Sequence, residues 1–175
     1  MAGKFSDSPY SGLLCYDRNN GYAAFYETDG SSHISLMQEH FDWRSSWTHI
    51  IPGVFGDSGY DGILLYDQEA GFAAFYDTDG QGSLVLLREY NDWPTSWTHV
   101  VVAPFTDSKY SGFLLYDKSA GVLAIYATDG RGGMTLSFAS AMTGLRDGHI
   151  SYGKILLGSS LDRDTVSAVC GFVFL

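Results

Sequence analysis

The fold is decided by one stretch of sequence, residues 55–80, which reads FGDSGYDGILLYDQEAGFAAFYDTDG. A close copy starts at Phe5 and reads FSDSPYSGLLCYDRNNGYAAFYETDG, and another starts at Phe105 and reads FTDSKYSGFLLYDKSAGVLAIYATDG. The three copies start 50 residues apart and align without an insertion. A period of about 20–50 residues is typical of repeat architectures, in which each repeat is one supersecondary unit. The sequence therefore predicts a tandem-repeat protein.

Each repeat has the pattern of four short β-strands. In the second repeat we expect strands at 62–67, 72–78, 83–90 and 96–105, separated by turns that contain Gly, Asp or Pro. β-branched and aromatic residues dominate these runs, and turn signals recur about every 8–12 residues, which favours an all-β fold. Only residues 137–148, SFASAMTGLRDG, have a pattern that would fit a helix.

The repeats fill a single domain, residues 1–175. Their boundaries fall at 5–54, 55–104 and 105–154, and residues 155–175 match the first half of a degenerate fourth repeat. Four-stranded units fit the blades of a β-propeller or, alternatively, the three units of a β-trefoil. Because propellers have about four to eight blades, either the degenerate repeat or a second chain must complete the ring. The partial fourth repeat favours the propeller, and a homodimer that closes the ring is one expected assembly.

The composition limits the classes of partner. The chain has a formal net charge of −10, and 45% of its residues are hydrophobic, which favours a folded domain. An acidic surface repels phosphate backbones, so neither nucleic acids nor anionic membranes are expected partners. The N-terminus, MAGKFSDS, has no apolar signal core, and no apolar run reaches the ~20 residues of a membrane span. We expect no transmembrane segment and a protein that is cytoplasmic or non-classically secreted.

The two cysteines, Cys15 and Cys170, are too few for a disulfide scaffold. Cys15 aligns with Leu65 and Leu115 of the other repeats. We therefore expect it to pack as a small apolar side chain, and a bridge to Cys170 is the alternative.

The stretch PGVFGDSGYDGILLYDQEAGFAAFYDTDGQG, residues 52–82, resembles the FG-GAP and VCBS family of propeller repeats. The resemblance recurs three times over residues 5–135, and SWTHIIPG at 46–53 is similar to the run-in to the next blade of that pattern. It implies propeller blades. Blades of this family often hold calcium in a loop that ends in an Asp just before the strand. The matching position here holds glycine in every repeat, so we expect no metal; the glycines are Gly12, Gly62 and Gly112.

Two repeats contain a tryptophan-rich segment, DWRSSWTH at 42–49 and DWPTSWTH at 92–99. An indole face beside a carboxylate suits a sugar ring, whose C–H face stacks on the indole and whose hydroxyls bond the acid. Packing of the Trp side chains between repeats is the alternative. Thr143 and Asp147 replace both Trp residues in the third repeat, whereas His149 is kept. The candidate ligand-binding residues are Trp43, Trp47, Asp42, His49, Trp93, Trp97, Asp92 and His99.

The sequence contains none of the motifs that identify common enzyme sites: no nucleophile elbow, no Gly-rich phosphate loop and no HExxH zinc motif. We therefore expect no catalytic residues and no cofactor. A residue that recurs in each repeat creates several equivalent sites, which is typical of multivalent binders. The sequence predicts a non-enzymatic, lectin-like protein whose partners are glycans or glycoproteins. The alternative is a structural or protein–protein interaction propeller, such as a toxin or assembly component, with buried Trp residues.

Overall fold

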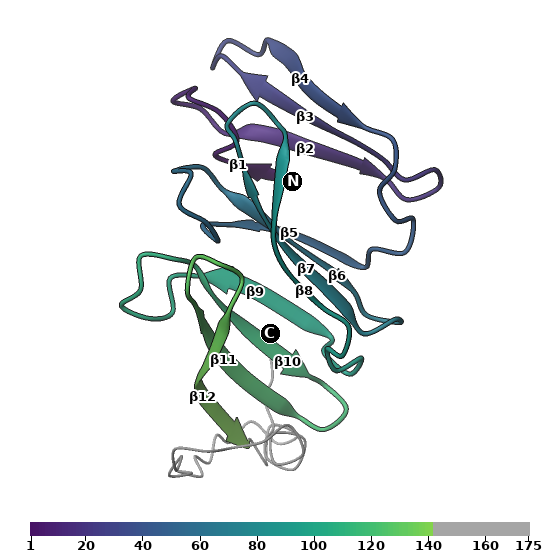
Figure 1. Ribbon diagram of the computed structural model, residues 1–175, viewed down its shortest axis with the longest axis vertical. Coiled ribbons are helices and arrows are strands. Elements are labelled where there is room, and N and C mark those ends of the chain that lie inside the picture. The colour runs from purple at the N-terminus through teal and green to yellow at the C-terminus, as the bar shows by residue number, and fades with distance from the viewer. Residues whose placement is uncertain (142–175) are drawn as a thin grey trace.

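The computed structural model describes residues 1–141, which form strands, turns and loops. Twelve strands build three four-stranded antiparallel sheets that follow one another along the molecule (Figure 1). This confirms the expected all-β class and the four-stranded repeats. Within residues 1–141 there is no helix, and hence none that could span a membrane. The degenerate fourth repeat at 155–175 lies outside the described residues, as do Thr143, Asp147 and His149.

Each sheet is a meander in which neighbouring strands are also neighbours in the chain. The first sheet consists of β1 (Ala2–Gly3), β2 (Gly12–Asp17), β3 (Tyr22–Thr28) and β4 (Ile34–His40). The second sheet consists of β5 (His49–Gly53), β6 (Gly62–Asp67), β7 (Phe72–Thr78) and β8 (Leu84–Tyr90). The third sheet consists of β9 (His99–Ala103), β10 (Gly112–Asp117), β11 (Val122–Thr128) and β12 (Met134–Ala141).

The sheets are offset from the sequence repeats. β5 lies at the end of the first sequence repeat, yet it pairs with β6, with His49 opposite Tyr66 and Gly53 opposite Gly62. β9 pairs with β10 in the same way. The last strand of the first and of the second sequence repeat is therefore the first strand of the next sheet, as the run-in at 46–53 implied.

The helix expected at 137–148 is wrong for residues 137–141, which belong to β12. Phe138 pairs with Ile125 of β11, and Ala139 pairs with Ala124. The ladder of hydrogen bonds from β11 and the burial of one face outweigh a local helical preference. Residues 142–148 lie outside the described part of the chain.

The hydrophobic core lies between the sheets. One cluster joins Phe5 and Phe25 of the first repeat to Ile63 and Leu65 of β6. The other joins the second sheet to the third, and its members include Phe55, Leu64, Phe75, Phe113 and Leu115. The second sheet is therefore covered on both faces, and every residue of β6 is buried. This explains why β6 reads as a nearly continuous apolar run rather than as an alternating strand.

Cys15 is exposed, so the expectation that it packs as a small apolar residue is wrong. Its counterparts Leu65 and Leu115 are only 2% and 3% exposed. Leu14 faces the second sheet, and successive side chains of a strand point to opposite faces, so Cys15 lies on the outer face of the first sheet. Within residues 1–141 no sheet covers that face. The possible partner Cys170 lies outside the described residues.

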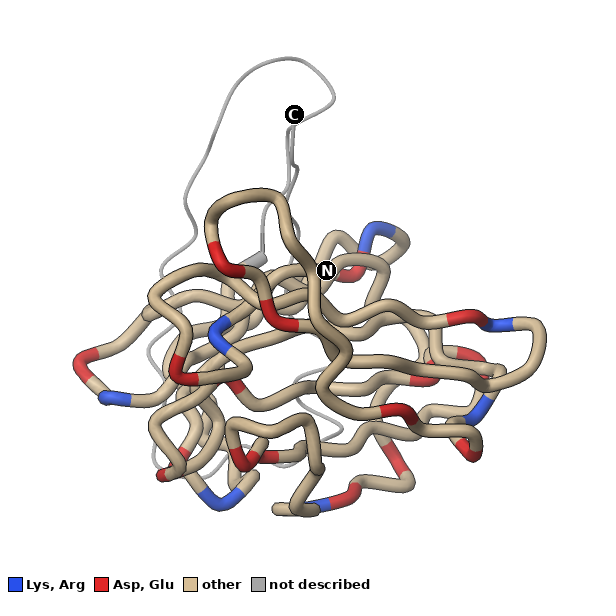
Figure 2. The backbone as a smooth tube through the Cα atoms, turned by 90° about the horizontal axis from the view of Figure 1, so that it is seen from above, with Lys and Arg blue, Asp and Glu red and all other residues tan. Residues whose placement is uncertain are grey.

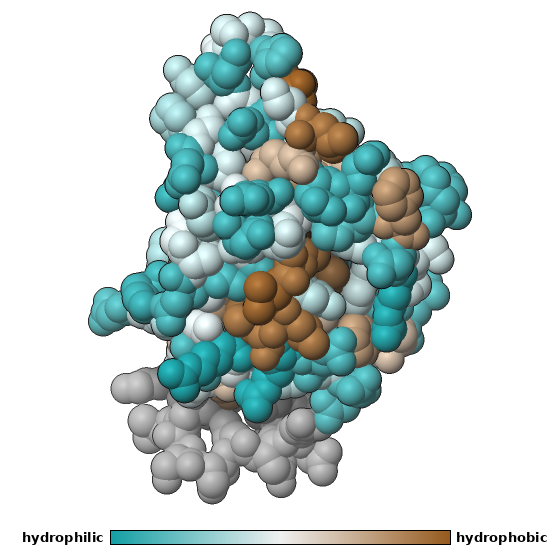
Figure 3. Space-filling view, turned by 45° about the horizontal axis from the view of Figure 1, so that its top comes forward, coloured by the Kyte–Doolittle hydropathy of each residue, from teal (hydrophilic) through white to brown (hydrophobic). Residues whose placement is uncertain are grey.

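Acidic residues are spread along the backbone rather than gathered in one place (Figure 2). Figure 3 shows an apolar patch near the middle of one face of the molecule. Exposed apolar side chains include Phe41, which is 72% exposed, and Val85, which is 57% exposed. Stacking of the three sheets therefore leaves some apolar surface uncovered.

Candidate functional site

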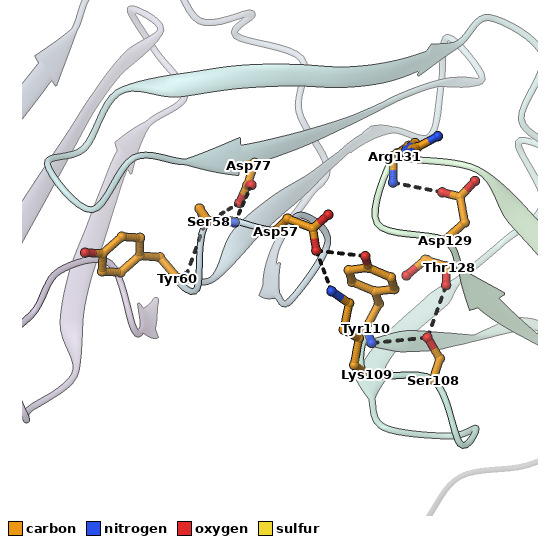
Figure 4. A network of polar contacts seen from close by, with 10 residues as sticks. All are labelled: Asp57, Ser58, Tyr60, Asp77, Ser108, Lys109, Tyr110, Thr128, Asp129 and Arg131. Atoms are coloured by element: carbon orange, nitrogen blue, oxygen red, sulfur yellow. Dashed lines mark hydrogen bonds and ion pairs between the residues drawn. The ribbon is translucent and has the colours of Figure 1, made fainter.

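A tyrosine–aspartate contact joins each sheet to the next. The Tyr60 hydroxyl donates a hydrogen bond of 2.7 Å to Asp7, and the Tyr110 hydroxyl donates one of 2.8 Å to Asp57. Lys109 also forms an ion pair of 2.6 Å with Asp57 (Figure 4). The Lys109 and Tyr110 hydrogen bonds lower the pKa of the Asp57 carboxyl, whereas the bond to Asp7 raises the pKa of Tyr60. Asp7 and Asp57 thus each bind a tyrosine of the following repeat.

A serine places the tyrosine of this contact. The Ser58 hydroxyl oxygen accepts a 3.1 Å hydrogen bond from the Tyr60 backbone N–H, and Ser108 accepts a 3.2 Å bond from the Tyr110 N–H. Such serine turns fix the loop conformation two residues further along the chain. The recurring Asp-Ser-x-Tyr motif therefore has a structural meaning that the sequence reasoning missed. The constant spacing of Asp and Tyr in every repeat was the available signal.

Backbone bonds reinforce the same junction. The Asp61 N–H donates to the Lys4 carbonyl over 2.8 Å, and the Lys4 N–H donates to the Asp61 carboxylate over 2.7 Å. Ser111 and Val54 repeat this reciprocal pair one repeat later, at 2.8 and 2.9 Å. The same pair of hydrogen bonds thus recurs at both junctions, so the junction between sheets is a regular interface.

At each end of the described chain, one of the two side chains of this junction lacks its counterpart: the tyrosine at the N-terminal end and the aspartate at the C-terminal end. Tyr10 is 51% exposed, and within residues 1–141 its hydroxyl has no aspartate partner like those of Tyr60 and Tyr110. Asp107 is exposed at the other end. Phe105 is 36% exposed, whereas its counterparts Phe5 and Phe55 are 0% exposed. The first sheet thus offers a tyrosine, and the third repeat offers an aspartate and an uncovered phenylalanine.

Most of the candidate Trp residues lie in the core. Trp47 and Trp93 are each 5% exposed, and Trp97 is 3% exposed. Trp93 packs with its ring centroid 5.2 Å from Tyr66 and 5.8 Å from Phe113. Trp93 and Trp97 therefore present no open indole face on which a sugar could stack.

The first Trp segment is less deeply packed. Trp43 is half-buried, with its ring centroid 5.9 Å from both Tyr16 and His40. The carboxylates that were expected to bind sugar hydroxyls, Asp42 and Asp92, are exposed. The structure thus places each Asp at the surface next to a Trp that points into the protein.

A glycine in the preceding turn holds each Trp loop. The Trp43 N–H donates to the Gly21 carbonyl over 3.1 Å, and the Trp93 N–H donates to the Gly71 carbonyl over 2.9 Å. Gly21 has a φ of 71°, and a Cβ there would lie 2.1 Å from the Trp43 carbonyl oxygen. Only glycine allows this close approach in the left-handed region.

The two candidate histidines cover tyrosine rings of β6 and β10. The His49 ring stacks on Tyr66 with centroids 5.3 Å apart, and the His99 ring lies 5.5 Å from that of Tyr116. Burial, with smaller contributions from His99 and Arg18, lowers the pKa of His49. The His49 imidazole is thus half-buried, whereas His99 is exposed although its ring lies against Tyr116.

A threonine orients each imidazole. The Thr48 hydroxyl donates to the Tyr66 carbonyl over 2.9 Å, and it lies 3.0 Å from Nδ1 of His49. A hydroxyl has a single proton, so the neutral imidazole donates from Nδ1 and leaves Nε2 as its acceptor. Thr98 holds His99 in the same way.

A pocket of about 350 Å³ lies beside Trp47, between the first and second sheets. β1 has only two residues, and within residues 1–141 no histidine stacks on Tyr16 as His49 stacks on Tyr66. The pocket thus occupies the place that corresponds to the imidazole in the other sheets. Its lining combines aromatic, apolar and polar side chains, namely Tyr16, Trp47, Met1, Leu14, Ile50, Arg18 and Thr48.

Arg18 gives this pocket hydrogen-bond donors, whereas the Trp47 Nε1–H is not accessible from it. The Trp47 Nε1–H is buried and has no acceptor within the described residues. Such an unsatisfied buried donor is uncommon and costs about 1–3 kcal/mol. Arg18 donates from Nη2 to the Trp47 carbonyl, which leaves further guanidinium N–H groups at the pocket. The site can therefore accept a group that carries hydrogen-bond acceptors or negative charge.

Within residues 1–141, no three His, Cys, Asp or Glu side chains gather as a metal site. The resemblance to FG-GAP and VCBS repeats stays a prediction. A comparison with protein-family models, with curated proteins and with solved structures finds no significant match to this chain.

Proposed function

We propose that the chain is a non-enzymatic repeat scaffold that acts through protein–protein contacts, first of all with a second copy of itself. The observation that carries this proposal is the repeated junction between sheets. Within residues 1–141, its tyrosine half is unmatched at Tyr10, and its aspartate half is unmatched at Asp107. The burial of Trp93 and Trp97 further supports a scaffold, because it removes the indole platforms of a multivalent lectin.

In the proposed dimer, Tyr10 of one copy donates to Asp107 of the other, as Tyr60 donates to Asp7 within the chain. This contact joins different surfaces of the two copies, so it forms a closed ring where the rotation between copies permits it. The Ser11 N–H pairs with the Pro104 carbonyl, by analogy with Ser111 and Val54. Pro104 has no N–H to return the second bond. The junction between copies is therefore weaker than the junctions inside the chain.

Charge and apolar burial act in opposite directions on this assembly. Covering Phe105 as Phe5 and Phe55 are covered removes apolar surface from water and favours association. Each copy carries a net charge of −10, so the copies repel one another at low ionic strength. Added salt screens this repulsion. Association should therefore strengthen as the salt concentration rises.

Sedimentation velocity of the full chain, from low to high micromolar concentration, tests the proposal. We expect a dimer that dissociates on dilution, and Tyr10→Phe and Asp107→Asn should each shift the equilibrium towards monomer. Tyr22→Phe is the matched control, because the Tyr22 hydroxyl bonds Glu39 inside the first sheet. A wild-type protein that stays monomeric at all concentrations and salt conditions would contradict the proposal.

Lectin-like carbohydrate binding is the second candidate function, and the pocket beside Trp47 is the observation that favours it. It places the half-buried Tyr16 side chain beside the exposed Arg18, and sugars need such a combination of apolar and polar surface. A glycan array with the wild-type protein and Trp47→Phe tests this function. Binding that is lost in the folded variant would support it, and an array without any bound glycan would reject it.

A further inference from the structure

We propose that the outer face of the third sheet, the face turned away from the second sheet, is covered by the apolar C-terminal residues 155–157 and 166–175 of the same chain. These residues take the place of the two Trp side chains that the third repeat lacks. They lie outside the described part of the chain. The inference goes beyond the proposed dimer, because it concerns how a single chain completes its own core.

The outer face of the third sheet is built like a core face. Phe113 and Leu115 pack against the second sheet, and successive side chains of a strand alternate, so Leu114 and Tyr116 point the other way. With Leu123 they form a separate cluster, in which Leu114 is 9%, Tyr116 6% and Leu123 7% exposed. Every residue of β10 is buried, as in β6, yet within residues 1–141 no sheet lies on this side. The face therefore needs a cover that the three described sheets do not supply.

In the second repeat, two Trp side chains fill the equivalent space. Leu64 and Tyr66 occupy the positions of Leu114 and Tyr116, and they share one cluster with Trp93 and Trp97. The Trp93 ring centroid lies 5.2 Å from that of Tyr66, and both Trp side chains are buried. A large part of the apolar cover over this face thus comes from the loop that leaves β8.

The third repeat has lost these side chains. Thr143 stands at the position of Trp93, and Asp147 stands at the position of Trp97. Thr is much smaller than Trp, and an unpaired carboxylate is costly to bury in an apolar layer. The cover over the third sheet therefore has to come from another part of the chain or from a partner.

The C-terminal residues have the composition of such a cover. Residues 155–157 read ILL, and residues 166–175 read VSAVCGFVFL. They follow β12 in the same chain, so their effective concentration at the third sheet is high, and docking costs no association entropy. A second copy would pay that entropy and would also bring a net charge of −10 against an equal charge. The same chain is therefore the favoured source of the cover.

The solvent accessibility of leucine methyl groups in the full-length protein tests the inference. A soluble nitroxide broadens the NMR signals of methyl groups that it can approach, and Leu→Ile variants assign the signals. We expect Leu114 and Leu123 to broaden as little as the buried Leu64, whereas Leu36, which is 52% exposed, should broaden strongly. This shielding should not change on dilution, because the cover belongs to the same chain.

Two results with the wild-type protein would overturn the inference. Shielding that is lost on dilution would assign the cover to a second copy, and methyl groups that are open at every concentration would leave the face without a cover. Sedimentation velocity on the same samples separates this inference from the proposed dimer. A strict monomer with shielded methyl groups would reject the dimer and support the same-chain cover.

A variant in the C-terminal residues identifies the cover. The triple variant Ile155→Ser, Leu156→Ser, Leu157→Ser should expose the methyl groups of the two outer-face leucines. The leucine of β6 should stay shielded, which reports that the sheets are still folded. Ser159→Asp with Ser160→Asp is the matched control, because it changes polar residues of the same segment and should leave the shielding as in the wild type. A folded triple variant that keeps both outer-face leucines shielded would overturn the inference.

Discussion

The first and second sheets have almost the same sequence pattern but different surroundings. The second sheet is covered on both faces, so Leu65 is 2% exposed, and Tyr66 is 0% exposed beneath His49. The first sheet is covered on one face only, so Cys15 is exposed, and Tyr16 borders a pocket. The role of a repeated residue therefore depends on the sheet that packs against it as much as on its own motif.

The largest expected effect comes from the two Trp segments. Trp93→Ala should lower the free energy of unfolding by about 3–5 kcal/mol, because Trp93 is buried between the second and third sheets. Trp43→Ala should cost clearly less, since Trp43 is only half-buried. Urea unfolding of both variants measures the difference. Equal losses would mean that Trp43 and Trp93 are packed alike.

A second pair of variants addresses the outer face of the first sheet. Leu65→Ala should destabilise by about 2–4 kcal/mol, because it leaves a cavity between two sheets. Cys15→Ala at the equivalent position should change stability by no more than about 0.5 kcal/mol. Urea unfolding at a concentration where the protein is monomeric gives both values. A large loss for Cys15→Ala would show that something covers this face in solution.

The histidine that covers Tyr66 predicts a pH dependence of stability. Burial lowers the pKa of His49 in the folded state, so the unfolded chain binds this proton more readily. The contribution of His49 to the free energy of unfolding should therefore be complete above the unfolded pKa of about 6.5, and it should decline as the pH falls below that value. His49→Gln should lose less stability than the wild type between about pH 7.5 and about pH 5.5.

Urea unfolding at the two pH values measures this difference. The exposed His33, changed to Gln, is the control and should behave like the wild type. Identical pH dependence in wild type and His49→Gln would show that His49 titrates alike in both states.

The smallest expected effect concerns the tyrosine hydroxyls. Tyr60→Phe removes the hydrogen bond to Asp7 at an exposed junction, so the melting temperature should fall slightly. Tyr10→Phe should leave the melting temperature of the dilute monomer unchanged, because Tyr10 has no such bond within the described residues. Differential scanning calorimetry on dilute samples compares the two. If the melting temperature fell for Tyr10→Phe and not for Tyr60→Phe, the Tyr10 hydroxyl and not the Tyr60 hydroxyl would be the one that forms a stabilising bond.

Part of the architecture could be read from local pattern. Alternating and continuous apolar runs, with Asp-Gly and Gly turns between them, predicted the strands from β2 to β12 within residues 1–141. The grouping of strands was harder to predict, because residues 96–105 look alike whether β9 closes one sheet or opens the next. The pairing of β9 with β10, for example of His99 with Tyr116, places β9 in the third sheet.

The candidate site was predicted less well than the fold. The sequence singled out the Trp and His residues, but a repeated Trp is compatible with a binding surface and with a core. Burial decided between these readings for Trp93 and Trp97. The pocket at Trp47 could not be predicted, because it depends on how the first and second sheets pack against each other.

The sequence by itself determined the repeat, its strands and its turns, because these depend on the local period of apolar residues and on backbone freedom at glycine and aspartate. The tertiary structure alone decided which copy of a repeated residue is buried, bonded or open. Tyr10 and Tyr60 share a motif, yet only Tyr60 meets an aspartate within the described residues. The physical reason is that side-chain burial and hydrogen bonding between sheets are made with the neighbouring repeat, about fifty residues away in the chain, so no local pattern contains them.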